Sequence, residues 1–207
     1  MKIKLKKKIV ALLMMVATCA MLAVCGGEED TVSSGATEEQ VETVYRHVEI
    51  TVKDYGTIKV ELNETVAPIT VANFIKLAEE GFYDGLTFHR IINGFMIQGG
   101  DPKGNGTGGS DEKIKGEFSA NGVENNLSHT RGAISMARAK SMDSASSQFF
   151  IMHEDADYLD GQYACFGYVT EGIEIVDAIC KDTPVVDNNG TVLPDNQPVI
   201  ESIKVID

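Results

Sequence analysis

The stretch from Gly85 to Gly167 consists of short apolar segments that are repeatedly interrupted by glycine. A layout of alternating strands and helices would need longer periodic segments between its strands. Short strands joined through glycine-containing turns instead favour an antiparallel sheet that curls on itself. The middle of this 207-residue chain therefore predicts a closed or nearly closed antiparallel sheet.

Alternation of apolar and polar residues indicates a hairpin before this stretch. Apolar residues occupy every second position on both sides of the turn Asp54-Tyr55-Gly56, namely Val48, Ile50, Val52, Ile58, Val60 and Leu62. A period of two puts these side chains on one face of each strand. We therefore expect two antiparallel strands with one buried face.

Two segments have the period of a helix instead. Residues 67–80 include Pro68, which suits a first helical turn, and are followed by Gly81 as a stop signal. A second helix is expected from Gly172 to Cys180, and a last strand from Val199 to Ile206. The apolar helix positions are Val71, Phe74, Ile75 and Ala78 in the first helix and Ile173, Ile175, Val176 and Ile179 in the second.

The first 24 residues have the pattern of a secretory leader and are not expected to join the fold. Residues 1–24 contain five lysines and no acidic residue, and the lysines all precede the apolar run Ile9–Val24. The run ends in Leu22-Ala23-Val24-Cys25, which resembles the bacterial lipobox, where the cysteine is diacylated and becomes the new N-terminus. Val24 departs from that pattern, which prefers a small residue before the cysteine. We expect cleavage after residue 24 and a lipid on Cys25.

Two other interpretations of the leader stay open. An uncleaved signal anchor would need about 20 apolar residues to span a bilayer, and the run has only about 16. A secreted form without lipid is the third interpretation. Residues 25–43 are polar and acidic with no apolar period, so they predict a flexible tether. Residues 44–207 are long enough for one domain with its own core.

The charge of the chain argues against nucleic acid as a partner. The sequence has 18 basic and 31 acidic residues, which gives a net charge of −13. Loss of the five leader lysines would move the net charge to about −18. Such a surface repels nucleic acid and anionic lipid, and it favours a monomer.

Two cysteines remain for the folded domain. Cys19 lies in the leader, and Cys25 would carry the lipid, which leaves Cys165 and Cys180. These two could form one disulfide, but nothing in the sequence fixes the distance between them. We favour free, partly buried thiols.

The segment Phe88–Asp101 groups one arginine, large apolar side chains and one amide. If Phe95–Gln98 forms a strand, Met96 and Gln98 share one face, and a preceding strand can bring Arg90 alongside them. This grouping suits a binding site, and it equally suits ordinary barrel core with a surface arginine. From the segment alone, both interpretations stay open.

The same segment resembles the signature of the cyclophilins, and further motifs of that family follow in order and at matching spacing. These motifs are Gly104–Gly109, Ser135-Met136-Ala137, Ser147–Ile151, Leu159-Asp160-Gly161 and Phe166-Gly167. Separated motifs in register are far more specific than one glycine-rich loop. The resemblance covers Val44 to Asp207. It implies a mainly β fold, a closed eight-stranded antiparallel barrel capped by two α-helices, and peptidyl-prolyl cis-trans isomerase activity.

Position by position, the resemblance implies Arg90, Phe95 and Gln98 as catalytic residues. The substrate-binding residues that it implies are Met96, Ala137, Arg138, Gln148, Phe150, Tyr158, Leu159 and Tyr163. Arg138 stands where many eukaryotic members have asparagine, at a position that contacts substrate mainly through its backbone. Tyr158 replaces a tryptophan and Tyr163 a histidine. Because tyrosine lacks the indole N–H donor, we expect weak cyclosporin binding.

The chemistry that this resemblance implies needs no nucleophile, metal or cofactor. Rotation about an X-Pro bond breaks amide resonance, against a barrier of about 18–20 kcal/mol, and localises a lone pair on the proline nitrogen. An apolar pocket can hold the proline ring. An Arg90 guanidinium that donates to the nitrogen stabilises the twisted transition state more than either ground state. The expected partners are proline-containing polypeptides.

Other chemistries lack their motifs. None of the four histidines has a Cys, His, Asp or Glu partner at ligand spacing, so no metal site is expected. The hydroxyl-rich segment Asp143–Ser147 lacks the Gly-x-Ser-x-Gly elbow of hydrolases. The loop Gly104–Gly109 is not followed by the Gly-Lys-Ser/Thr of a phosphate-binding loop.

One alternative function keeps the same fold. The domain could act as a proline-peptide binding module or holdase chaperone whose isomerase activity is incidental. Arg90 discriminates between the two, because a pure binder gains little from a group that acts on the transition state. The leader and the tether indicate an extracytoplasmic protein, anchored to the cell membrane, that assists secreted or surface proteins as they fold.

Overall fold

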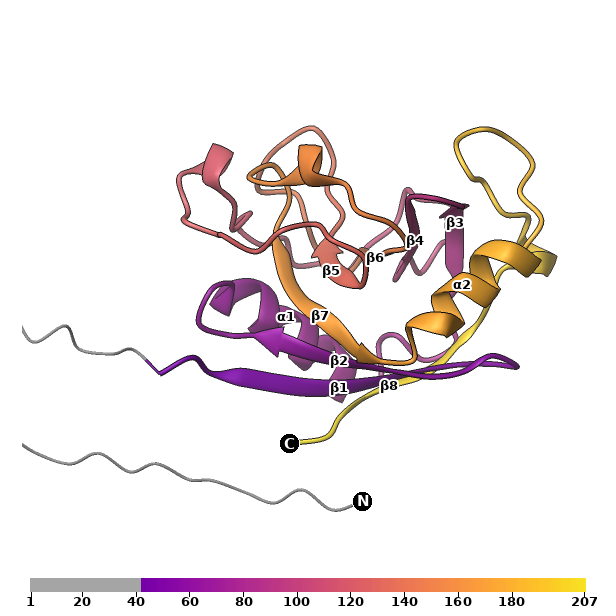
Figure 1. Cartoon of the computed structure of the whole chain (residues 1–207), viewed down its shortest axis with the longest axis horizontal. Helices are drawn as coiled ribbons and strands as arrows, with labels where there is room; N and C mark the ends of the chain where they lie inside the picture. The colour runs from indigo at the N-terminus through magenta and orange to yellow at the C-terminus, as the bar shows by residue number, and fades with distance from the viewer. Residues whose placement is uncertain (1–41) are drawn as a thin grey trace, which may run out of the picture. The chain divides into compact units, whose positions relative to one another are not determined.

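The computed structural model of the chain describes residues 42–207 (Figure 1). The expected leader over residues 1–24, the lipid on Cys25 and nearly all of the expected tether over residues 25–43 lie outside the described residues. Among the helices of the described part, none is long and apolar enough to cross a membrane.

One antiparallel sheet of eight strands forms the body of the fold, in the order β3-β4-β6-β5-β7-β2-β1-β8. The strands are β1 (Tyr45–Val52), β2 (Gly56–Asn63), β3 (Phe88–Ile92), β4 (Met96–Gly99), β5 (Ala133–Met136), β6 (Phe149–Met152), β7 (Cys165–Glu171) and β8 (Ile200–Val205). The helices are α1 (Pro68–Glu79) and α2 (Ile173–Asp182), with short 3-10 turns at Ser119–Asn121, Asp157–Leu159 and Pro194–Asn196. The expected mainly β fold with eight antiparallel strands and two helices is confirmed.

The sheet curls into a half-barrel whose two edge strands, β3 and β8, meet only at a short seam. Residues just before them form one bridge, Thr87 with Val199. Around it, the Gly85 N–H donates to the Ile200 carbonyl at 2.8 Å. The expectation of a closed barrel is therefore overstated, because β3 and β8 do not pair along their length. The sheet bends far enough for the edges to touch, and the loops fill the remainder.

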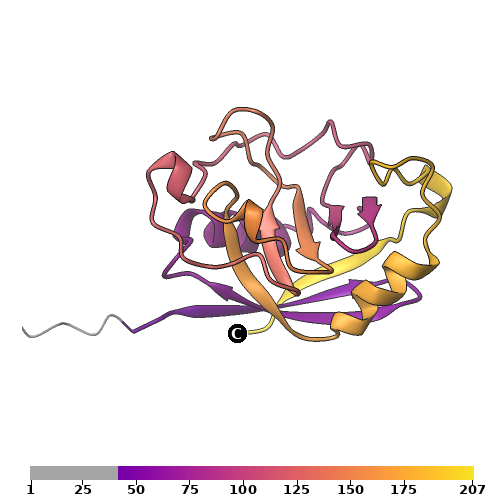
Figure 2. The same ribbon diagram turned by 45° about the horizontal axis from the view of Figure 1, so that its top comes forward.

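The predicted hairpin is the β1–β2 pair. Ile50 lies opposite Ile58 and Val48 opposite Val60, and these side chains are buried. Asp54 in the turn has a φ of 66°, a left-handed conformation that aspartate tolerates better than most residues. Figure 2 shows this long hairpin along one side of the molecule and the loops around β5 and β6 on the opposite side.

The first helix starts at Pro68, as the sequence predicts, but its N-terminus is capped from far along the chain. Ala67 provides no side-chain cap. Instead, the carboxylate of Glu117 accepts hydrogen bonds from the N–H groups of Ile69 and Thr70, at 3.0 and 2.7 Å. This carboxylate satisfies N–H groups that have no partner within the helix, and its charge interacts favourably with the helix dipole.

The main core lies between the sheet and the two helices, and aromatic rings dominate it. The Phe74 ring of α1 lies edge-on to Phe149 of β6, with centroids 5.4 Å apart. Tyr83 and Phe166 pack against the same Phe74 ring. A second, smaller cluster of buried side chains lies on the other side of β4, β5 and β6, and consists of Met96, Ala133, Phe150, Met152, Ala156, Leu159 and Cys165. This second cluster forms the base of the candidate site.

Candidate active site

Strand register brings the polar and aromatic candidates together. Arg90 on β3 lies opposite Gln98 on β4, and Gln98 lies opposite Phe150 on β6. Met96 and Gln98 share a face of β4, as alternation predicts, and both line the same pocket. Three adjacent strands thus place their side chains in one row across the outer face of the sheet.

The row opens onto a pocket of about 230 Å³. It is lined by Arg90, Phe95, Met96, Gln98, Ala137, Arg138, Phe150, Leu159 and Tyr163. The two other predicted site residues lie beside it. Gln148 lines an adjoining pocket of about 320 Å³ that also includes Gln98 and Ala137. Tyr158 is 64% exposed and stacks on Phe95, with ring centroids 6.1 Å apart.

Arg90 is held at the edge of this pocket by two oxygen acceptors, and its Nη1 also lies 3.9 Å from Met96 Sδ. Its Nε donates to the Asn189 carbonyl at 2.9 Å, and its Nη1 donates to Gln98 Oε1 at 3.1 Å. Within residues 42–207 its Nη2 makes no hydrogen bond, so that nitrogen can donate to a bound molecule. Burial lowers the pKa of Arg90 from its ordinary value, although a guanidinium stays charged in proteins. The result is a fixed, partly desolvated cation beside an apolar pocket.

A chain of side-chain amides orients Gln98 toward Arg90. Gln98 Nε2 donates to Gln148 Oε1 at 2.9 Å, and Gln148 Nε2 donates to the Gly108 carbonyl at 2.7 Å. Because each amide nitrogen has a partner, the carbonyl oxygen of Gln98 is left to face Arg90. The sequence placed Gln148 in the site but gave no sign of this chain of hydrogen bonds.

The apolar wall is formed by aromatic and aliphatic side chains from separate segments. Met96, Phe150 and Leu159 are buried, and Phe95 is partly exposed at the rim. Tyr163 meets Phe150 edge-to-face, with centroids 5.9 Å apart. Such a wall excludes water and offers contacts to an apolar ring.

The Arg138 side chain closes one end of the pocket through contacts within the protein. Its guanidinium lies 4.7 Å from the centre of the Tyr163 ring and 5.1 Å from that of Phe118. Its Nη2 and Nε also donate to the Gln162 carbonyl, at 2.9 and 3.1 Å. The side chain therefore fixes the position of Tyr163.

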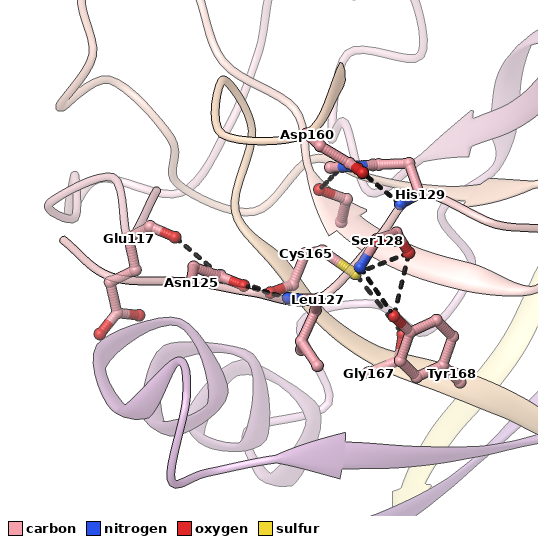
Figure 3. Close-up of polar contacts among 10 residues, drawn as sticks. Glu117, Asn125, Leu127, Ser128, His129, Asp160, Cys165, Gly167 and Tyr168 are labelled. Carbon is pink, nitrogen blue, oxygen red and sulfur yellow. Dashed lines mark hydrogen bonds and ion pairs between the residues drawn. The ribbon is translucent and has the colours of Figure 1, made fainter. Parts of the chain in front are cut away.

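Behind the pocket lies a buried histidine that the sequence did not single out for the site. The His129 ring stacks on Phe150, with centroids 6.0 Å apart. Its Nδ1 lies 2.7 Å from Asp160 Oδ1 (Figure 3). Its Nε2 lies 3.0 Å from Ser135 Oγ. Burial lowers the pKa of His129, although Asp160 acts in the opposite direction, so the ring is neutral at neutral pH. The ring supports Phe150 from behind.

Figure 3 also shows how the surrounding loops are tied to β7. Asn125 Nδ2 donates to the carbonyls of Glu117 and Cys165, each at 2.8 Å. The Tyr168 hydroxyl donates to the Ser128 carbonyl at 2.9 Å.

The two cysteines of the folded domain, Cys165 and Cys180, are buried free thiols, which is the alternative that we favour from the sequence.

Comparison with known families agrees with this geometry. Residues 47–205 match the family described as "Cyclophilin type peptidyl-prolyl cis-trans isomerase/CLD". The chain is 52% identical over 122 residues to peptidyl-prolyl cis-trans isomerase B of Bacillus subtilis (strain 168), which covers 59% of this chain and 82% of the relative. It is 40% identical over 175 residues to peptidyl-prolyl cis-trans isomerase A of Dickeya dadantii (strain 3937), which covers 79% of this chain and 86% of that relative.

Solved structures show the same likeness. A crystal structure of a cyclophilin type peptidyl-prolyl cis-trans isomerase from Cryptosporidium parvum superimposes with a TM-score of 0.70 at 32% identity, and covers 79% of this chain and 99% of that one. A second structure of the same protein, in the presence of the dipeptide Ala-Pro, superimposes with a TM-score of 0.68 at 31% identity and covers 78% of this chain and 99% of that one.

Proposed function

Because the chain belongs to the cyclophilin-type peptidyl-prolyl cis-trans isomerases, we propose that the pocket around Arg90 isomerises X-Pro bonds in proteins that fold outside the cytoplasm. The isomerase activity itself follows from the family. The choice of clients and the role of each residue are our proposal. The crystal structure of a relative in the presence of Ala-Pro supports proline-containing peptides as ligands of this pocket.

The observation that carries the assignment is the position of Arg90. A charged, partly desolvated guanidinium lies beside an apolar pocket, held by the Asn189 carbonyl and Gln98. The proline ring would occupy the apolar part, against Phe95, Met96 and Phe150. An Nη2 donor would then face the proline nitrogen, which gains a localised lone pair only as the X-Pro bond twists.

This arrangement lowers the barrier through electrostatics. The donor is already oriented, so no reorganisation is needed as the transition state forms. Gln98 acts by orienting Arg90 and by contacting the peptide, and Phe95 covers the ring. Met96, Phe150 and Leu159 hold the proline ring together with Phe95. The other substrate-binding residues are Ala137, Arg138, Gln148, Tyr158 and Tyr163.

An isomerisation assay of the full-length chain and of Arg90→Ala tests this mechanism. The substrate is a short Ala-Pro peptide, and exchange between its isomers is followed by NMR while binding is measured in parallel. We expect the exchange rate of Arg90→Ala to fall roughly 100-fold or more, as when one preorganised donor is removed from a transition-state site. Arg46→Ala is the matched control, since Arg46 pairs with Asp207 and does not line the pocket.

The alternative is a proline-peptide binding module or holdase. Slow exchange in both the parent and Arg90→Ala, with peptide binding intact, would favour that function. Fast exchange that is unchanged in Arg90→Ala would retain the isomerase but remove the arginine from its mechanism.

We also propose that the protein is a bacterial lipoprotein, with a leader over residues 1–24, a lipid on Cys25, a tether over residues 25–43 and an isomerase domain over residues 44–207. The five lysines and the apolar run of the leader support this organisation, as does the cysteine followed by Gly-Gly. Globomycin blocks cleavage of lipoprotein leaders, so it should increase the apparent size of the protein. Cys25→Ala should abolish the incorporation of labelled lipid. Unchanged size and an unchanged membrane fraction in both experiments would exclude the lipid anchor.

The strong negative charge supports a monomer, which light scattering can check.

A further inference from the structure

His89 is the residue next to Arg90, and its environment is unusual for a buried side chain. Only 4% of the residue is exposed. Within residues 42–207, neither Nδ1 nor Nε2 has a hydrogen-bond partner. His129, by contrast, has a polar partner at each nitrogen. Buried polar groups are nearly always satisfied, so an imidazole with two unpaired nitrogens indicates a place where another molecule completes the bonding.

A break in strand register directs His89 and Arg90 to the same side. The pairing of β3 with β4 shifts between Phe88 and Arg90, which leaves His89 as the extra residue. Neighbouring residues on a regular strand point to opposite faces, but a bulge removes that alternation and is often found beside functional sites. As a result, His89 and Arg90 line one pocket of about 460 Å³, together with Gln98.

This pocket, which we call the flanking pocket, lies between two loops. One wall is Gly104–Gly106, and the other is the segment from Asn189 to Gln197. Gln197 ties the walls together, because its Nε2 donates to the Gly104 carbonyl at 2.8 Å and to the Val192 carbonyl at 2.9 Å. The flanking pocket is therefore formed before any ligand arrives, which reduces the entropy that binding would cost.

The chemistry of the flanking pocket favours an uncharged polar ligand. Burial lowers the pKa of His89, and the neighbouring Arg90 lowers it further, although Asp101 acts in the opposite direction. A neutral imidazole has one donor and one acceptor, which match a peptide group or an amide or hydroxyl side chain. An ammonium group would be repelled by Arg90. Leu193, which is half exposed, and Pro194 add an apolar rim.

We propose that the flanking pocket is a second subsite for the client polypeptide, in which His89 hydrogen-bonds an uncharged polar residue or peptide group next to the X-Pro bond. The subsite rests on the isomerase function of the Arg90 pocket, since both pockets share Arg90 and Gln98. A chain whose proline lies against Phe150 would continue past Gln98 into the flanking pocket. The rate of isomerisation would then depend on residues that flank the X-Pro bond, and not on the proline alone.

The test compares a four-residue Ala-Pro peptide with peptides that carry four added residues, Ser-Asn-Ser-Gly, on one side or on the other. Isomerisation and NMR binding are measured with the full-length chain. We expect lengthening on one side to raise kcat/KM by about threefold to tenfold, the range of a single neutral hydrogen bond. The same lengthening should lower the dissociation constant of the peptide by a similar factor.

Two variants of the flanking pocket and one control complete the test. In His89→Leu, the ratio of kcat/KM between the long and the short peptide should fall to about one. Leu193→Lys at the exposed rim should reduce this ratio without a change in the core. Val186→Lys alters a similarly exposed apolar residue of the same loop that does not line the flanking pocket, so the ratio should stay at the parent's value.

The outcomes are distinguishable from failure of the isomerase itself. Equal rates and equal binding for short and long peptides in the parent would overturn the subsite, as would a ratio that survives in both His89→Leu and Leu193→Lys. No turnover of the short peptide would count against the isomerase alone, because the binding measurements with the long peptides would still decide on the subsite.

Discussion

The Nε atom of Arg90 donates a hydrogen bond to the backbone carbonyl of Asn189, at 2.9 Å, although 99 residues separate them. Arg90 lies on β3, and Asn189 lies in the loop between α2 and β8. Gly190 holds this loop against β3, since its carbonyl accepts a hydrogen bond from the Ile91 N–H at 2.8 Å. The orientation of the arginine thus depends on a loop that does not touch the proline pocket.

Gly190→Ala should therefore lower isomerase activity. Gly190 has a φ of 80°, and a Cβ there would overlap the Ile91 carbonyl oxygen. The loop must move away from β3 and take the Asn189 carbonyl with it. Because a hydrogen bond to a charged group contributes about 1.5–3 kcal/mol, we expect kcat to fall roughly tenfold or more, as measured by NMR exchange. Gly122→Ala is the control, since Gly122 has a φ of 73° but no atom within 4 Å of the added Cβ. Equal losses in both variants would contradict this account.

Gln148→Leu should disconnect the chain of amides that orients Gln98. The Nε2 of Gln98 would lose its acceptor, which is 2.9 Å away in the parent. The Gln98 amide could then rotate, and Arg90 would lose a fixed partner. We expect kcat/KM to fall about tenfold. Gln148→Glu keeps an acceptor for Gln98 but has no donor for the Gly108 carbonyl, so its kcat/KM should lie between those of the parent and of Gln148→Leu. Full activity of Gln148→Leu would show that the amide chain does not contribute to the mechanism.

Arg138→Ala should weaken substrate binding more than turnover. The guanidinium holds Tyr163 in place through the ring contact at 4.7 Å and the bonds to the Gln162 carbonyl. Cation–π contacts contribute about 0.5–2 kcal/mol, so we expect KM to rise several-fold while kcat changes little. Steady-state kinetics at saturating and limiting peptide separate the two constants. A fall in kcat at constant KM would argue instead for a direct role of Arg138 in the chemical step.

Mild acid should destabilise the fold. Burial lowers the pKa of both His89 and His129, so the unfolded state takes up protons at a higher pH than the folded state. Stability from these groups is complete above the unfolded pKa of about 6.5 and is lost as the pH falls toward the lowered values. The loss is up to about 1.4 kcal/mol per pH unit for each histidine. Urea unfolding at pH 7 and pH 5 measures it, and His89→Leu should reduce the slope. An unchanged slope would show that His89 does not contribute.

The two thiols should be inert in the folded protein. Burial raises the pKa of Cys165 and of Cys180 to about 12, so very little thiolate forms at pH 8. We expect the thiol reagent DTNB to modify both slowly in the native state and rapidly in urea. Rapid modification of either thiol without denaturant would contradict their burial.

The elements that the sequence predicts well are those with a local signal. The β1–β2 hairpin follows from alternation around Asp54–Gly56, and the start of α1 follows from Pro68. The candidate pocket follows from motifs whose order matches the family, and the strand register then brings Arg90, Gln98 and Phe150 together.

The features that the sequence does not predict depend on contacts between distant segments. The Asn189 carbonyl is a backbone atom, so its bond to Arg90 leaves no residue-type signature. Glu117 caps a helix that begins 49 residues earlier, so no local capping pattern exists. The bulge at His89 arises from pairing with β4, and only the paired strands show which residue is extra.

The first and last strands of the domain are direct neighbours. Ile50 of β1 lies opposite Ile203 of β8, and β1 is held between β2 and β8. A polypeptide that emerges N-terminus first from a ribosome or a translocation channel can therefore not complete its sheet until β8 has emerged as well. Until then, β1 presents an open backbone edge to other chains. A domain with this topology completes its sheet only once residues 200–205 can pair with β1, and until then it carries an exposed strand edge that the finished domain covers.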